Sequence, residues 1–223
     1  LEDAAEETPD PKEWTANISS RCGADPDGVI TAVDMLLAAE RPVILVGQGV
    51  RYGQAGDDLL RLAERLRISV AASASGLGAI DSNHPLALGV VARAGHYQAN
   101  HATRQADVLL ALGVRFDDRT SSSWLPGYSF TIPPTKLIHV DIDPDEIGRN
   151  YPISLGLMAD VRTFIRQILA ELDRRHNLSK CADAREAWLK EIDNYRREGD
   201  KFVSPGFLAD TTPIDPQRAA IEI

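Results

Sequence analysis

Short apolar runs alternate with amphipathic segments along most of the chain. Five runs are short and rich in aliphatic residues, which is typical of buried strands, and they lie at residues 43–46, 68–72, 106–112, 136–143 and 153–158. Helices are predicted between these runs, at residues 29–37, 59–66, 95–105 and 161–172. Strands that alternate with helices predict an α/β fold: a Rossmann-like, doubly wound parallel sheet of about six strands with helices on both faces.

Two of the predicted helices have a clear first residue. Asp160 precedes the most regular helical pattern in the chain, and an aspartate at that position accepts hydrogen bonds from free backbone N–H groups of the first turn. Asp25 or Asp27 is the expected N-cap of the helix at residues 29–37.

The composition divides the chain into three parts. Residues 1–26 are polar and contain prolines, so we expect a linker, and residues 27–178 hold the alternating pattern of the central domain. Residues 179–223 are predicted to form a helix near 182–197 and then a second linker, from Gly199 onward, that ends where Asp215 and Pro216 begin another helix. The chain starts without Met and stops inside that helix, so we expect it to be a piece of a longer protein.

Charge and composition exclude several classes of protein. The formal net charge is −9 with no basic block, so we expect no nucleic-acid partner. No apolar run approaches the ~20 residues that span a bilayer, so we expect no membrane partner. Cys22 and Cys181 lie far apart with no CxxC pair, which fits a reducing, cytoplasmic compartment better than a disulfide framework.

The most informative feature is the sequence GVRFDDR at residues 113–119, directly after the apolar run at 106–112. It places two arginines and two aspartates at the carboxyl end of a predicted strand, where open α/β sheets bind ligands. Arginine binds phosphate groups bidentately, so these residues indicate a phosphate-bearing ligand. A surface cluster of salt bridges is the alternative interpretation.

Three other predicted strands also end in glycine or acid, at Gly47-Gln48-Gly49, Gly76-Leu77-Gly78 and Asp141-Ile142-Asp143. Glycine lets the backbone approach a ligand, and a carboxylate there accepts hydrogen bonds from ribose hydroxyls. Each short motif is weak alone, because a tight turn is a more common explanation of it than a nucleotide contact. Together they favour a nucleotide site, although the third glycine of GxGxxG is missing after Gly49, which argues against a standard nicotinamide dehydrogenase.

No complete catalytic or metal-binding set is visible in the sequence. The five histidines are not spaced as metal ligands, and no GxSxG surrounds the serines at 121–123. We therefore predict no catalytic residue and no metal ligand in this chain.

Over about residues 27–172 the chain resembles the central domain of thiamine-diphosphate-dependent enzymes, and most closely that of acetolactate synthase large subunits. The matching segments are residues 41–49 (RPVILVGQG), 76–80 (GLGAI) with His84-Pro85, 95–100 (GHYQAN), 106–119 (ADVLLALGVRFDDR) and 139–147 (HVDIDPDEI). The resemblance implies a three-domain parent that carries thiamine diphosphate and Mg2+ on its other two domains, where the catalytic glutamate also lies. It further implies a homo-oligomeric carboligase or decarboxylase, and no catalytic activity for this chain alone.

In acetolactate synthases the central domain binds FAD in a largely structural role, whereas relatives hold ADP or nothing. The resemblance implies that Arg115 contacts the diphosphate and Asp141 the adenosine ribose. The full set of implied cofactor-binding residues is Gly47, Gly49, Ser73, Gly76, Gly113, Arg115, Asp117, Arg119, Asp141, Ile142 and Asp160.

Two segments depart from the family. Residues 92–95 read Ala-Arg-Ala-Gly where acetolactate synthases have Gly-Met-His-Gly, which removes groups that line the flavin and adds a cation, Arg93, that could meet an anionic nucleotide or coenzyme. Residues 120–128 replace the usual Val-Thr-Gly. These departures leave open a domain that has lost its nucleotide and acts as a scaffold between domains and subunits. A sirtuin-like deacylase is a more remote alternative, disfavoured because two distant cysteines cannot form a four-cysteine zinc module.

Overall fold

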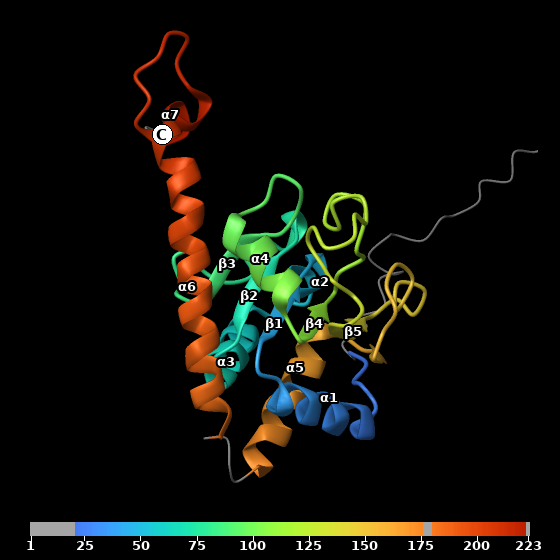
Figure 1. Cartoon of the computed structure of the whole chain (residues 1–223). Coiled ribbons are helices and arrows are strands. Elements are labelled where there is room, and N and C mark those ends of the chain that lie inside the picture. The colour runs from blue at the N-terminus through green and yellow to red at the C-terminus, as the bar shows by residue number, and fades with distance from the viewer. Residues whose placement is uncertain (1–20, 176–179, 222–223) are drawn as a thin grey trace, which may run out of the picture.

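A six-stranded, all-parallel sheet forms the centre of the computed structural model, which describes residues 21–175 and 180–221 (Figure 1). The strand order is β3-β2-β1-β4-β5-β6, and every neighbouring pair is parallel. This confirms the predicted α/β, Rossmann-like fold. The strands are β1 (Pro42–Val46), β2 (Ser69–Ala72), β3 (Ala87–Val90), β4 (Val108–Leu112), β5 (Lys136–Asp141) and β6 (Leu155–Met158).

Helices cover both faces of the sheet, as predicted. Alternate residues of β1 enter two separate cores: Ile44 and Val46 point to one face, and Val43 and Leu45 to the other. The first core is closed by α1 (Pro26–Ala38), α3 (Gly56–Leu66) and α5 (Val161–Arg174), the second by α4 (Tyr97–Gln105) and α6 (Lys180–Phe207). Two short helices, α2 (Gln48–Tyr52) and α7 (Pro216–Ile221), and a 3₁₀ turn at Ala74–Gly76 complete the described part of the fold.

The predicted helix starts are confirmed. Asp25 caps α1, where its side chain accepts hydrogen bonds from the N–H groups of Asp27 and Gly28, and Pro26 occupies the first turn. Asp160 caps α5 by accepting from Thr163 N at 2.9 Å. The predicted linker at residues 1–26 lies outside the described residues up to position 20.

The predicted linker after residue 199 is wrong up to residue 207, because α6 continues through Gly199 and Pro205 to Phe207. Gly199 is buried against α4: a Cβ added there would lie 2.9 Å from Tyr97 Cβ, so only glycine lets the two helices pack this closely. In Figure 1, α6 runs along the whole body and its last turns extend past the sheet.

Two elements were not predicted, namely β3 and α2. Strand β3 is short and contains Gly89, whose φ of +82° and close contact with the His96 ring are unusual within a strand. Strand β5 ends at Asp141 rather than at residue 143. Within the part of the chain that the structure describes, no helix has the length and apolar character needed to cross a membrane.

Candidate functional site

The strand order reverses direction between β1 and β4, and this position determines where a ligand can bind. From β1 the chain builds β2 and β3 on one side, then returns and adds β4, β5 and β6 on the other. In open α/β sheets the loops diverge at such a point and leave a crevice at the carboxyl ends of the strands. Here Gly47 follows β1 and Gly113 follows β4 at this point of the sheet.

Four predicted glycines, Gly47, Gly49, Gly76 and Gly113, meet where three loops pack backbone against backbone, and this set is called the glycine contact below. Gly47 N donates to Leu112 O at 3.0 Å, and a Cβ on Gly47 would lie 2.0 Å from Gly113 O. A Cβ on Gly76 would lie 2.2 Å from Val46 O, and one on Gly49 would lie 2.8 Å from Gly113 Cα. Packing between the loops therefore requires these glycines whether or not a ligand is present.

The charged segment after β4 lines a hollow of about 340 Å³, called the charged hollow below, whose lining is Arg115, Asp117, Asp118, Trp124, Glu146, Arg149 and Asn150. Arg115 and Arg119 are exposed, and among the described residues neither forms an ion pair. Asp117 accepts a hydrogen bond from Thr120 N at 2.8 Å, and Glu146 accepts one from Arg149 at 2.8 Å. Asp117 and Glu146 are thus engaged internally, and the third acid of the lining, Asp118, is exposed. The guanidinium groups of Arg115, in the lining, and of Arg119, which follows it in the same segment, remain available to an anion.

Asp141 and Ile142 follow β5 on the same edge of the sheet. Asp141 is buried, and its Oδ1 accepts from Asp143 N at 3.0 Å. Ile142 is 63% exposed, which is high for an isoleucine beside a buried carboxylate.

Ser73 and Asp160 have structural partners of their own. Ser73 Oγ accepts from Gly76 N at 3.2 Å and caps the short turn that follows β2. Asp160 caps α5 and also forms an ion pair with Arg21 at 3.2 Å. The eleven predicted residues thus follow the carboxyl ends of five strands, β1, β2, β4, β5 and β6. Four of them form the glycine contact, five follow β4 and β5 (Arg115, Asp117, Arg119, Asp141 and Ile142), and Ser73 and Asp160 are caps.

One buried histidine, which sequence reasoning did not assign to the site, links the loops of the charged hollow. His139 Nε2 lies 2.8 Å from Val114 O, and Gly148 N donates to Nδ1 at 3.3 Å, so the ring is neutral with its proton on Nε2. Burial lowers the pKa of His139 and outweighs the opposing effects of the Val114 carbonyl, Asp141 and Glu146. No sequence signal distinguishes this histidine from an ordinary buried strand residue.

Asn150 holds the same loop from outside. Its side-chain amide donates to the carbonyls of Arg115 and Phe116, at 3.0 and 3.2 Å. Phe116 has a φ of +51°, a strained conformation for a bulky residue, which turns the backbone between Arg115 and Asp117. Among the described residues, no group of three or more His, Cys, Asp or Glu side chains is arranged to hold a metal ion.

Comparison with known proteins agrees with this architecture. The family model for the thiamine pyrophosphate enzyme central domain matches residues 29–168. The probable acetolactate synthase large subunit of Methanocaldococcus jannaschii is 38% identical over 187 residues, which are 84% of this chain and 29% of that protein. That of Methanococcus aeolicus is 33% identical over 202 residues, covering 89% of this chain and 32% of the relative.

The acetolactate synthase large subunit of Haemophilus influenzae is 34% identical over 165 residues, 74% of this chain and 28% of that protein. The chain therefore spans about three tenths of the length of these curated relatives. The match covers the sheet, the crevice and α1 to α5, and it confirms the family that the motifs predicted. The chain belongs to the family of thiamine pyrophosphate enzyme central domains.

Proposed function

We propose that this chain is the central domain of an acetolactate-synthase-like, thiamine-diphosphate-dependent carboligase or decarboxylase, and that it binds FAD at the carboxyl edge of its sheet. The observation that carries this proposal is a pair of exposed arginines, Arg115 and Arg119, that form no ion pair within the described part of the chain and lie beside the reversal of strand order. A diphosphate carries two negative charges, and guanidinium groups bind it bidentately. The relatives' printed names support the chemistry of the parent enzyme.

The residues at this edge fit a dinucleotide. Arg115 and Arg119 would bind the diphosphate, and Asp141 has a second carboxylate oxygen for a ribose hydroxyl, since Oδ1 is held by Asp143 N. Exposed Ile142 would pack against the adenine ring. Gly47, Gly49, Gly76 and Gly113 would let the dinucleotide lie close to the backbone, and bound FAD would supply a flavin ring with a structural role.

The chain is expected to show no carboligase activity by itself. The resemblance assigns thiamine diphosphate, Mg2+ and the catalytic glutamate to the other two domains of the parent. In the parent, this domain would hold its neighbours in place within a homo-oligomer.

A scaffold domain without a nucleotide is the second candidate. It is favoured by the glycine contact, which packing alone explains, and by Ser73 and Asp160, which act as caps. The scaffold hypothesis gives no role to Arg115 and Arg119, which form no ion pair among the described residues.

Titration of the purified chain with FAD and, in parallel, with ADP separates these candidates. Flavin fluorescence and calorimetry would report binding. We expect FAD to bind more tightly than ADP, because the flavin end adds contacts along the edge. Binding of ADP alone would exclude FAD as the ligand, and no binding of either nucleotide would favour the scaffold.

A further inference from the structure

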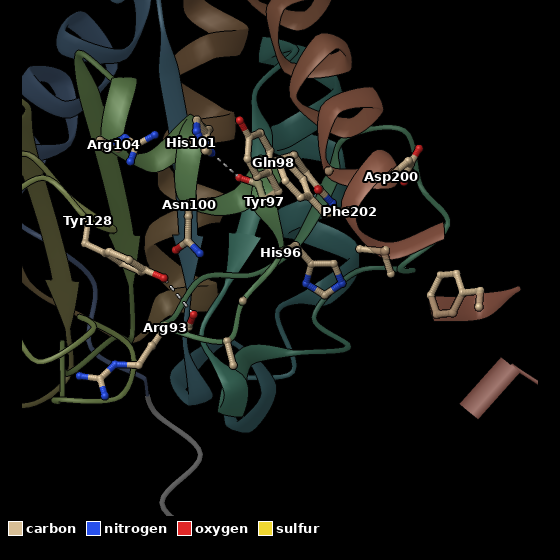
Figure 2. A pocket seen from close by; sticks show the side chains of 15 residues that line it. Arg93, His96, Tyr97, Gln98, Asn100, His101, Arg104, Tyr128, Asp200 and Phe202 are labelled. Atoms are coloured by element: carbon tan, nitrogen blue, oxygen red, sulfur yellow. Dashed lines mark hydrogen bonds between the residues drawn. The ribbon is translucent and has the colours of Figure 1, made fainter. Parts of the chain in front are cut away.

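The two segments that depart from the family sequence, residues 92–95 and 120–128, are joined to each other in the folded chain. Arg93 donates a hydrogen bond to Ser123 Oγ at 3.2 Å, and the Tyr128 hydroxyl donates to the backbone carbonyl of Arg93 at 3.1 Å. Figure 2 shows the Tyr128 hydroxyl directed at that carbonyl. These two hydrogen bonds are called the latch below, and they make the two departures parts of one structural unit.

The loop at residues 120–128 lines two hollows that share no lining residue. Trp124 belongs to the charged hollow, whereas Tyr128 and Arg93 belong to a larger hollow, of about 670 Å³, between α4 and the last turns of α6. The family resemblance assigns the diphosphate to the charged hollow and the flavin to residues 92–95. A bound FAD would therefore reach from the charged hollow to the latch.

This loop has a buried base and an exposed tip. Ser122 and Ser129 are buried, and their hydroxyl groups lie 2.8 Å apart, which closes the base. The tip, residues 123–128, is largely exposed to solvent, with Trp124 at 44% and Leu125 at 57%. Little apolar surface is therefore removed from water when the tip takes up its position, and burial contributes little to holding it there.

The backbone is strained where the tip leaves the base. Ser122, Ser123 and Trp124 have φ angles of +52°, +58° and +54°, all in the left-handed region. Each such angle costs conformational free energy in a residue that carries a side chain. The latch and a hydrogen bond from Trp124 Nε1 to Phe116 O, at 3.0 Å, oppose this cost. Because water competes for the exposed bonds of the latch, their net contribution is small, and a ligand can displace them.

We propose that residues 123–128 form a lid whose latch opens before a dinucleotide occupies the sheet-edge site, whereas ADP binds with the latch closed. This inference rests on the proposed function, because the ligand is the one assigned there. A ligand that needs the open lid binds less tightly, in proportion to the fraction of chains in which the lid is open. Arg93, Ser123 and Tyr128 thus select the ligand by its length, and all three lie in the segments that depart from the family.

Binding of FAD and ADP to latch variants tests the proposal. Tyr128→Phe removes one bond of the latch and keeps the ring, and Ser123→Ala removes the other bond and keeps Arg93. In each variant we expect FAD to associate about threefold faster by stopped-flow flavin fluorescence and to bind about threefold more tightly by calorimetry, because more chains have an open lid. ADP affinity should not change. Thr31→Val removes an exposed hydroxyl bond to Asp27 O within α1, and this matched control should alter the binding of neither nucleotide.

Amide hydrogen exchange of the nucleotide-free chain tests the latch without any ligand. The backbone N–H groups of Trp124 and Tyr128 donate to Ser121 O and Leu125 O, at 3.0 and 3.2 Å. Both should exchange about threefold faster in Tyr128→Phe, with the unfolding midpoint unchanged, because the tip opens locally.

Three results would overturn the lid alone: unchanged exchange at the tip, unchanged FAD binding in both latch variants, or an equal gain in affinity for ADP. Failure of FAD to bind to any of these chains is a different result. It would overturn the proposed function, and the role of the lid with it.

Discussion

Two clusters of arginine and carboxylate side chains show how the same residue types serve different ends in this molecule. In the Asp58 cluster, one buried carboxylate is shared by three arginines: Nε of Arg166 lies 2.8 Å and Nε of Arg162 3.2 Å from Oδ2, and Arg61 approaches Oδ1 at 3.8 Å. These contacts tie α3 to α5. Each of the three guanidinium groups is thus paired with a carboxylate inside the fold.

The charged hollow has the reverse arrangement. Asp117 and Glu146 are engaged internally and Asp118 is exposed, whereas Arg115 of the hollow and the neighbouring Arg119 have no carboxylate partner among the described residues. The backbone beneath them is held tightly by the glycine contact and by His139, while the guanidinium groups are free. Partnering, and not composition, therefore distinguishes a structural cluster from a candidate binding site.

The largest expected effect concerns the rigid backbone under the charged hollow. Gly47→Ala places a Cβ 2.0 Å from Gly113 O, so the β1 and β4 loops must separate, and we expect a loss of about 3 kcal/mol in the free energy of unfolding. Urea denaturation followed by circular dichroism measures it.

Gly78→Ala is the matched control for this change. Gly78 has a φ of +84° but no atom within 4 Å of an added Cβ, so only conformational strain of about 1 kcal/mol is expected. Equal losses for the two variants would show that the glycine contact does not hold the loops.

Asp58→Asn should destabilise the chain by about 2 kcal/mol, because three guanidinium groups lose their shared anion. The loss is no larger because Arg61 and Arg166 are more than half exposed, and solvent screens their charges. FAD affinity should stay within about twofold of the unchanged chain. The exposed neighbour Asp57 provides the control: Asp57→Asn is expected to cost less than about 0.5 kcal/mol. A large change in FAD affinity for Asp58→Asn would break the contrast between the two clusters.

The two regions should respond to acid in different pH windows. Burial lowers the pKa of His139, so the folded state binds its proton less readily than the unfolded state, and stability is lost as pH falls below 6.5. For Asp58, burial raises the pKa, but hydrogen bonds and charges of Arg166 and Arg162 outweigh it and lower the pKa overall. Its contribution is therefore present above 3.8 and is lost only as pH falls below that value.

Unfolding midpoints between pH 3 and pH 8 would resolve the two windows. His139→Gln should reduce the loss of stability that sets in below pH 6.5. Burial also lowers the pKa of His101, so some loss in this pH range should persist in the variant. Asp58→Asn should flatten only the lower one. If His139→Gln loses stability below pH 6.5 as the unchanged chain does, then His139 is not the source of that loss.

Much of the fold was predictable because its signals are local. The five predicted strands and the caps Asp25 and Asp160 depend on residue types and spacing, and the structure confirms them. Strand β3 was missed because Gly89 adopts a positive φ within it. The end of α6 was missed because Gly199 and Pro205 are helix breakers in isolation, and the contact of Gly199 with Tyr97 overrides that preference.

The candidate site was predictable in position but less so in mechanism. Parallel strands bring their carboxyl ends to one edge, so the motifs after β1, β2, β4 and β5 could be placed together from the sequence. That Gly47 and Gly76 pack against carbonyl groups, and that His139 joins two loops, depends on distances that no sequence pattern contains. The hollow between α4 and the last turns of α6 was not predicted, because part of its lining comes from residues 199–207, which the sequence predicted to be a linker.

The central claim is that a free guanidinium at the sheet edge binds the diphosphate of a nucleotide, and calorimetry of FAD with the Arg115→Ala chain tests it most directly. We expect the affinity to fall by more than about 1 kcal/mol in binding free energy, because a charge-assisted phosphate contact is lost, with the unfolding midpoint unchanged. Arg61→Ala, which removes an arginine from the Asp58 cluster, should leave FAD affinity unaltered. Equal FAD affinity in the Arg115→Ala and unchanged chains would contradict the account and remove Arg115 from the site.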